Sequence, residues 1–183
     1  MRKGITYVDD KNNTLGYLLV ARIPPLLIGL VLGVVLSYVT SRFEQVLSKN
    51  IKVAYFIPFI VYIADAVGTQ TENIYVRNLR SGKAKFKDYV IKESLLGAIM
   101  GAISGGMIFV FVDLLAGGFM LGLAVSLATM ATITLAPLVA LTVVEILELE
   151  HTDPAVGAGP IATVIQDTIS VVIYGLVASW IIL

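Results

Sequence analysis

The chain has 183 residues, of which 57% are hydrophobic and only 14% charged, and its formal net charge is zero. Soluble domains average about 25% charged residues, so this composition excludes an ordinary soluble enzyme and indicates an all-α membrane protein. One helical crossing of the bilayer takes about 20 apolar residues, and the apolar content predicts five crossings. The absence of cysteine excludes disulfides, iron–sulfur clusters and cysteine-ligated zinc.

The chain begins with a polar stretch, residues 1–14, which we expect to be a short cytoplasmic N-terminal segment. It lacks the cleavage site of a secretory signal, so the five-helix transport domain is expected to cover residues 15–183. The first transmembrane helix is predicted at residues 15–40. Pro24 and Pro25 interrupt it, and we expect a kink or break there because proline removes backbone donors.

The second transmembrane helix is predicted at residues 53–76 and carries two acids, Asp65 and Glu72. Ionisable groups inside a membrane are costly and usually mark a functional site. The third helix is predicted at residues 90–112. Its glycines recur every four residues, a spacing that lets helix backbones approach closely and predicts tight helix packing; they are Gly97, Gly101 and Gly105.

The fourth transmembrane helix is predicted at residues 119–147, after a tight turn at Asp113 and Gly117-Gly118. An acidic segment closes it, and we interpret this segment as a solvated helix end, with a cytoplasmic metal site as the alternative; its residues are Glu145, Glu148, Glu150 and His151. The fifth helix is predicted at residues 158–183. Of the thirteen lysines and arginines, ten fall on one side of this topology, which predicts a cytoplasmic N-terminus and an outer C-terminus.

Two polar stripes carry the candidate site. One lies on the second predicted helix and the other on the fifth, and in each the spacing places the side chains on one helix face. The predicted metal ligands drawn from these stripes are Asp65, Thr69, Glu72, Thr163 and Asp167. Carboxylate, hydroxyl and carbonyl oxygens suit a hard cation. The stripes therefore predict a path for Mg²⁺, with Ca²⁺, Mn²⁺ and Co²⁺ as alternatives.

Other functions lack their motifs. No phosphate-binding loop is present, so ATP does not drive the chain directly. An aspartyl intramembrane protease also uses two aspartates, but its Tyr-Asp and Gly-x-Gly-Asp motifs are absent, since Asp65 follows Ala64 and Asp167 follows Gln166. We therefore expect no enzyme and no nucleic-acid partner. A proton- or sodium-coupled cation carrier and a non-transporting membrane scaffold stay open as alternatives.

The same two segments resemble a known family. The stretch IPFIVYIADAVGTQTENIYVRNL, residues 57–79, contains the Gly-x-Gln and closing Arg-x-Leu of MgtE-type magnesium channels and of the related solute carrier family 41. The stretch DPAVGAGPIATVIQDTISVVIYGLVA, residues 153–178, resembles their last span, with Asp-Pro-Ala, a later proline, and an aspartate seven residues beyond it.

This resemblance implies a homodimer in the plasma membrane, with an ion path between two protomers lined by the second and fifth helices. It also implies that Asp167 is the central carboxylate for hydrated magnesium and that the backbone oxygen of Thr163 faces the same site. The sequence departs from the family pattern at Asp65-Ala66-Val67, where Gly-Gly-Asn is usual, and at Gly159, where asparagine is usual. The family's cytoplasmic magnesium-sensing domains are not found in these 183 residues, so we expect different gating.

Overall fold

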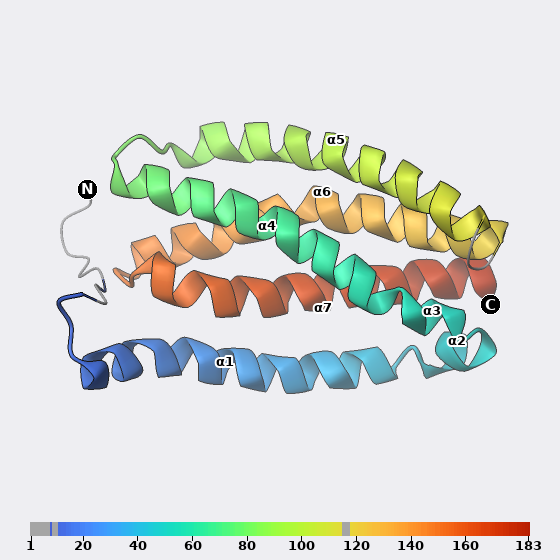
Figure 1. Ribbon diagram of the computed structural model, residues 1–183, viewed down its shortest axis with the longest axis horizontal. Coiled ribbons are helices and arrows are strands. Elements are labelled where there is room, and N and C mark those ends of the chain that lie inside the picture. The colour runs from blue at the N-terminus through green and yellow to red at the C-terminus, as the bar shows by residue number, and fades with distance from the viewer. Residues whose placement is uncertain (1–7, 9–10, 115–117) are drawn as a thin grey trace.

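The structure, a computed structural model, describes residue 8 and residues 11–114 and 118–183. Its long helices lie side by side along one axis (Figure 1). The described residues form helices and no strands, and five spans are long and apolar enough to cross a membrane, which confirms the predicted all-α membrane fold. The helices are α1 (Leu15–Ser41), α2 (Glu44–Lys49), α3 (Lys52–Tyr55), α4 (Ile57–Arg80), α5 (Phe86–Val112), α6 (Phe119–Leu149) and α7 (Pro154–Ile182).

Helix α1 runs through Pro24 and Pro25 without interruption, so the expected break is absent. Prolines are tolerated inside membrane helices where neighbouring helices pack against them. Pro25 is buried in just this way, since its ring lies near Gly157 of α7. Most other side chains of α1 are exposed, and the helix borders the rest of the bundle along α7 (Figure 1).

The second span is not one helix, as predicted, but a short α3 and a long α4 that meet at Phe56. Pro58 lies in the first turn of α4, where its missing N–H costs little. The fifth span begins at Pro154 and continues as helix through Gly157 and Pro160, earlier than the predicted residue 158. Asp153 explains this early start, because its side chain caps α7 by accepting from the Ala155 N–H at 3.1 Å.

The end of α7 near Asp153 is tied to other segments by the same carboxylate. Asp153 is 5% exposed and forms an ion pair with Arg80, at the end of α4, over 2.9 Å. Its second oxygen accepts from the backbone N–H of Val8 at 2.8 Å. Val8 is a described residue of the expected N-terminal segment, of which residues 1–7 and 9–10 lie outside the described part. One buried carboxylate therefore joins α4, α7 and this residue.

The close helix packing predicted from the glycine repeat is confirmed. Gly97, Gly101 and Gly105 face α6, and a Cβ at each would lie 3.0, 2.7 and 3.0 Å from a backbone carbonyl oxygen of that helix. The predicted turn between these helices falls partly on residues 115–117, outside the described residues. Gly118, which precedes α6, has φ 79°, a conformation that glycine adopts without strain.

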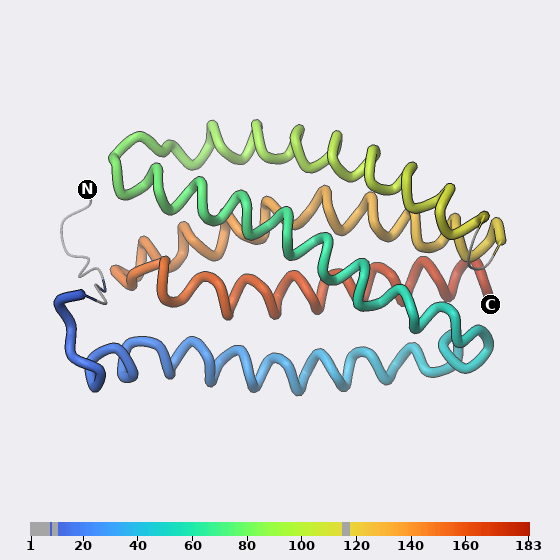
Figure 2. The backbone as a smooth tube through the Cα atoms, viewed as in Figure 1, coloured from blue at the N-terminus to red at the C-terminus, as the bar shows by residue number. Residues whose placement is uncertain are grey.

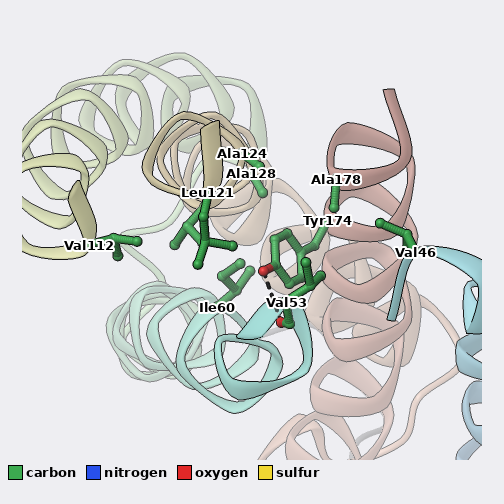
Figure 3. Close-up of a cluster of buried hydrophobic side chains, with 10 residues drawn as sticks. Val46, Val53, Ile60, Val112, Leu121, Ala124, Ala128, Tyr174 and Ala178 are labelled. Atoms are coloured by element: carbon green, nitrogen blue, oxygen red, sulfur yellow. Dashed lines mark hydrogen bonds between the residues drawn. The ribbon is translucent and has the colours of Figure 1, made fainter. Parts of the chain in front are cut away.

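Two apolar clusters hold the bundle, one toward each end. The first, shown in Figure 3, packs residues of α6 and α7 against Val46, Val53 and Ile60, and the Tyr174 hydroxyl donates to the Val53 carbonyl at 2.9 Å. The second packs Tyr75 against Leu141, Val144, Ala158 and Ala162. The residues of these two clusters lie toward opposite ends of α4, α6 and α7, and the middle parts of the three helices form a layer between them. Figure 2 shows the backbones of these helices running alongside one another. The polar residues of those helices are concentrated in that middle layer.

Candidate cation path between α4 and α7

The two predicted polar stripes meet in the fold. Helices α4 and α7 pack against each other, and the Thr163 hydroxyl of α7 donates to the Asp65 carboxylate of α4 over 2.9 Å. The two residues are 98 positions apart in the chain. This hydrogen bond fixes the orientation of a partly buried carboxylate at the middle of α4.

Two more carboxylates lie along this junction, Glu72 on α4 and Asp167 on α7. Both are partly buried, and both interact electrostatically with Asp65. Oxygen Oδ1 of Asp167 is buried and has no hydrogen-bond partner among the described residues. Glu72 approaches α7 at Gly159, where a Cβ would lie 4.0 Å from its Oε1. Like charges in a poorly screened environment repel strongly, so this arrangement favours a cation between them.

The remaining predicted ligand, Thr69, lies on the outer surface of the helix bundle. It is exposed on α4, as are its polar neighbours Gln70 and Asn73. These residues lie inside a helix that is long and apolar enough to span the bilayer. The structure thus places Asp65, Glu72, Thr163 and Asp167 along one junction and leaves Thr69 on the adjoining outer face of α4.

Gln166 is a residue of this junction that the sequence pattern missed. Its side chain is 2% exposed, its Oε1 has no hydrogen-bond partner in the part of the chain that the structure describes, and it lies against Gly68 of α4. Any Cβ at residue 68 would overlap the Gln166 amide. The available signal was the presence of a polar residue in an apolar span. Because Gln166 directly precedes Asp167 in the chain, it lies on a different helix face from the predicted polar stripe.

The acidic end of α6 divides into two environments. Glu148 is 4% exposed, and the Glu145 carboxylate accepts a 2.7 Å hydrogen bond from the Tyr75 hydroxyl. His151 is exposed on the turn after the helix, with φ 57°, and does not line the cavity that Glu145 and Glu148 share. The interpretation of this whole segment as a solvated helix end is therefore wrong for Glu148.

Another buried acid, Glu93 of α5, was also missed. It is 8% exposed and accepts a 2.7 Å hydrogen bond from the Thr71 hydroxyl of α4. The sequence pattern did not single it out, because it lies directly before the apolar run that begins at Ser94. Within the described residues of one chain, no three His, Cys, Asp or Glu side chains are grouped so that they could hold a metal ion.

A bundle of five apolar spans with carboxylates along an internal helix junction defines a class, the multi-pass membrane proteins that place charge inside the bilayer for function. Comparison with known families gives the particular one. The MgtE family, described as "Divalent cation transporter", matches residues 57–177, which include all of α4 through most of α7. The chain belongs to the MgtE family. This family is one of transporters rather than catalytic enzymes.

Two relatives illustrate the match. The chain is 31% identical to "Magnesium transporter MgtE" of Enterococcus faecalis (strain ATCC 700802 / V583) over 161 residues, 86% of this chain and 36% of the relative. It is 26% identical to the protein of the same description from Bacillus subtilis (strain 168) over 175 residues, 94% of this chain and 38% of the relative. The chain thus spans less than two fifths of the length of these relatives.

Proposed function

We propose that two copies of this chain form a homodimer in the plasma membrane and conduct Mg²⁺ along a path lined by α4 and α7 of both copies. The proposal has the N-terminus in the cytoplasm and the C-terminus outside. The observation that carries it is the exposed polar face of α4. Thr69, Gln70 and Asn73 would face lipid in a single copy, and polar groups in a bilayer normally face a bundle interior or water. A second copy would cover them.

Each ligand has a distinct role in this proposal. Asp167, with its unpaired buried oxygen, is the central carboxylate. The Thr163 hydroxyl positions Asp65, and the Thr163 backbone oxygen faces the path. Glu72 attracts the cation nearer the cytoplasmic end of α4, and Thr69 adds a hydroxyl from the outer face of that helix.

The chemistry favours a hydrated ion. Mg²⁺ gives up its water reluctantly and is usually held by one or two carboxylates with several waters retained. No three acids of one described chain are grouped closely enough to hold a bare ion. Two copies would supply Asp167 twice, which suits binding that attracts the ion and still releases it. Mg²⁺ is accordingly the proposed substrate, and Ca²⁺, Mn²⁺ and Co²⁺ are competitors to be tested in the same assay.

Proteoliposomes containing a Mg²⁺-sensitive dye test the path. Asp167→Asn keeps the shape of the side chain and removes its charge, and we expect Mg²⁺ influx to fall about tenfold or more, as for the loss of ~1.4 kcal/mol or more of interaction. Asp88→Asn is the matched control, because Asp88 is exposed in the first turn of α5 and away from the path. Unchanged influx in folded Asp167→Asn would contradict the assignment. Influx that requires a proton or sodium gradient would instead indicate a coupled carrier.

Crosslinking tests the dimer, and the absence of cysteine from the sequence makes single-cysteine variants unambiguous. Thr69→Cys in native membranes should give a crosslinked dimer with a short bismaleimide. Leu95→Cys is the control, because Leu95 is 63% exposed on α5, outside the α4–α7 junction. Equal crosslinking at both positions, or at Leu95 alone, would contradict an interface along α4.

A further inference from the structure

A lysine surface lies where α4 ends and α5 begins. Its members are two residues of the turn between the helices, Lys83 and Lys85, and two at the start of α5, Lys87 and Lys92. All four side chains are exposed, and in the described part of the chain no ion pair engages their ammonium groups. Asp88 is the acid among them. The next acid, Glu93, is buried and accepts from the Thr71 hydroxyl at 2.7 Å, so the surface keeps a net positive charge.

The turn that carries Lys83 and Lys85 is fixed to the end of α4. The Gly82 N–H donates to the Leu79 carbonyl and the Lys83 N–H to the Asn78 carbonyl, each over 2.9 Å. Gly82 has φ 69°, a conformation that glycine adopts without strain. Both α4 and α5 belong to spans that are long and apolar enough to cross a membrane, so the turn between them lies at a membrane surface. The lysine surface is therefore held at the level of lipid headgroups.

An exposed apolar row runs along α5 from the lysine surface into the span. Its members follow Lys87 at intervals of four residues, so that successive side chains are neighbours on the helix. They are Ile91, Leu95, Ile99 and Ile103, which are 71, 63, 49 and 58% exposed. The row lies opposite the α5 glycines that contact α6, so α6 does not cover it. Lysine stems lie readily along apolar surface while their ammonium groups stay at the headgroups.

We propose that the lysine surface binds an anionic phospholipid, with the headgroup phosphate at the lysines and an acyl chain along Ile91 and Leu95. Basic loops are common on one side of membrane proteins. Here the basic residues lie directly above an exposed apolar row on the same helix, and this combination favours a lipid over a soluble phosphate. Each lysine near an anionic membrane strengthens binding about fivefold. No residue of the proposed cation path takes part in the contact.

Fluorescence quenching by brominated lipids tests this proposal, because the sequence contains a single tryptophan. Ile91→Trp in a Trp180→Phe background places an indole one helical turn from Lys87. Trp180 itself is 80% exposed near the end of α7, and α7 begins beside the end of α4 at the Asp153–Arg80 ion pair. Trp180 therefore reports on the opposite end of the bundle. The full chain is reconstituted in phosphatidylcholine vesicles with a minority of phosphatidylglycerol, and either lipid carries the bromine atoms.

Brominated phosphatidylglycerol should quench the indole at position 91 with a local affinity about tenfold or more above that of brominated phosphatidylcholine. The preference should be lost when all four lysines are replaced by glutamine, and kept when all four are replaced by arginine. Lys52→Gln should also keep it and is the matched control, because Lys52 is an exposed lysine at the start of α3, beyond the other end of α4. Trp180 in the wild-type chain should show a smaller preference.

Salt provides a test that needs no lysine variant, because raising the chloride concentration should weaken a charge-based preference. Inorganic phosphate should weaken it no more than chloride at equal ionic strength. A stronger effect of phosphate would assign the lysines to a soluble anion and overturn the proposal.

Three further results would overturn it. They are equal quenching by the two lipids at position 91, a preference that survives all four glutamine substitutions, and an equal preference at both ends of the bundle. Quenching by neither lipid would indicate that a second copy of the chain covers this face of α5, and it would also contradict the proposal. Thermal unfolding checks that each variant is folded. The measurement needs no transport, so its outcome is independent of the proposed cation path.

Discussion

Two helix junctions of this bundle, α5–α6 and α4–α7, are built on opposite principles. Along α5–α6, backbone meets backbone: a Cβ at Gly101 would lie 2.7 Å from the Met130 carbonyl oxygen, and the Ser126 hydroxyl donates to the Gly105 carbonyl at 2.8 Å. Along α4–α7, side chains fill the space instead. Gly68 faces the amide of Gln166, and buried oxygens of Gln166 and Asp167 have no partner among the described residues.

This difference separates structure from function. Lipid supplies no hydrophobic drive between helices, so close packing of small residues is what holds membrane helices together. The α5–α6 junction has that packing, and no ion pair joins the described residues of the two helices. The α4–α7 junction contains carboxylates and the Gln166 amide in place of close backbone contact. The unpaired oxygens of Gln166 and Asp167 need a ligand, a water or a second copy of the chain as their partner. We expect substitutions at α5–α6 to change stability, and substitutions at α4–α7 to change ion handling as well.

The largest expected effect on stability is at Gly101. The Gly101→Ala methyl would press on the backbone of α6, which has no rotamer to change, and such overpacking typically costs about 1–3 kcal/mol. Gly106→Ala is the control on the same helix, because no atom lies within 4 Å of its Cβ position. That control should leave the free energy of unfolding unchanged or raise it by up to about 1 kcal/mol.

Thermal unfolding in detergent measures both variants. Equal melting temperatures for Gly101→Ala and the wild-type chain would show that α5 and α6 can move apart at no cost in stability. That result would contradict the description of α5–α6 as a junction held by close backbone packing. Thr134→Ala should not rescue Gly101→Ala, since the obstructing atom nearest the new methyl belongs to the Met130 backbone.

Gly68→Ala should behave differently, because its obstacle is a side chain. The added methyl would overlap the Gln166 amide, which is the far end of a flexible side chain and can turn aside, so stability should fall by less than for Gly101→Ala, by about 1 kcal/mol. The displaced amide should also reduce Mg²⁺ influx. The double variant with Gln166→Ala removes the obstacle and should recover at least half of both losses. Gln166→Ala alone should cost little, because it also removes a buried oxygen without a partner.

A double-mutant cycle on melting temperature and influx checks this rescue. Additive losses, with no recovery in the double variant, would mean that Gly68 and Gln166 do not act on each other. The α4–α7 junction would then be no more adjustable than α5–α6.

The sequence predicted close packing at the glycines of α5, because a glycine repeat in an apolar helix lets another backbone approach, but it did not predict that α6 is the partner. It also predicted that the stripes carrying Asp65 and Asp167 belong together, since each is a charged group in a span and needs a common polar environment. The five spans follow from apolar length alone. These features depend on the spacing of residues within a single helix, which can be read directly from the sequence.

The sequence could not predict features that depend on which neighbour a residue meets. Pro25 suggests a break, but packing against Gly157 of α7 keeps α1 continuous. Gln166 lies beside a selected residue, and its burial follows only from the approach of α4. Glu148 resembles a surface acid in sequence, and the loop before α5, which encloses it, is more than sixty positions away in the chain.

The smallest expected effects compare two hydrogen bonds of similar length, one at each junction. Ser126→Ala removes the 2.8 Å bond to the Gly105 carbonyl, and Thr163→Val removes the 2.9 Å bond to Asp65. Interhelical hydrogen bonds in membranes contribute about 0.6 kcal/mol, so both variants should lose similar, small amounts of stability in thermal unfolding.

Mg²⁺ influx should separate them. Ser126→Ala should transport at the wild-type rate, because the carbonyl it releases belongs to α5, which carries none of the proposed ligands. Thr163→Val frees the Asp65 carboxylate to turn away from the path or toward Asp167, so influx should fall several-fold, and Thr163→Ser should restore it by restoring the hydroxyl. If Thr163→Val lowers stability but leaves influx unchanged, the bond is structural, and Asp65 does not take part in the path.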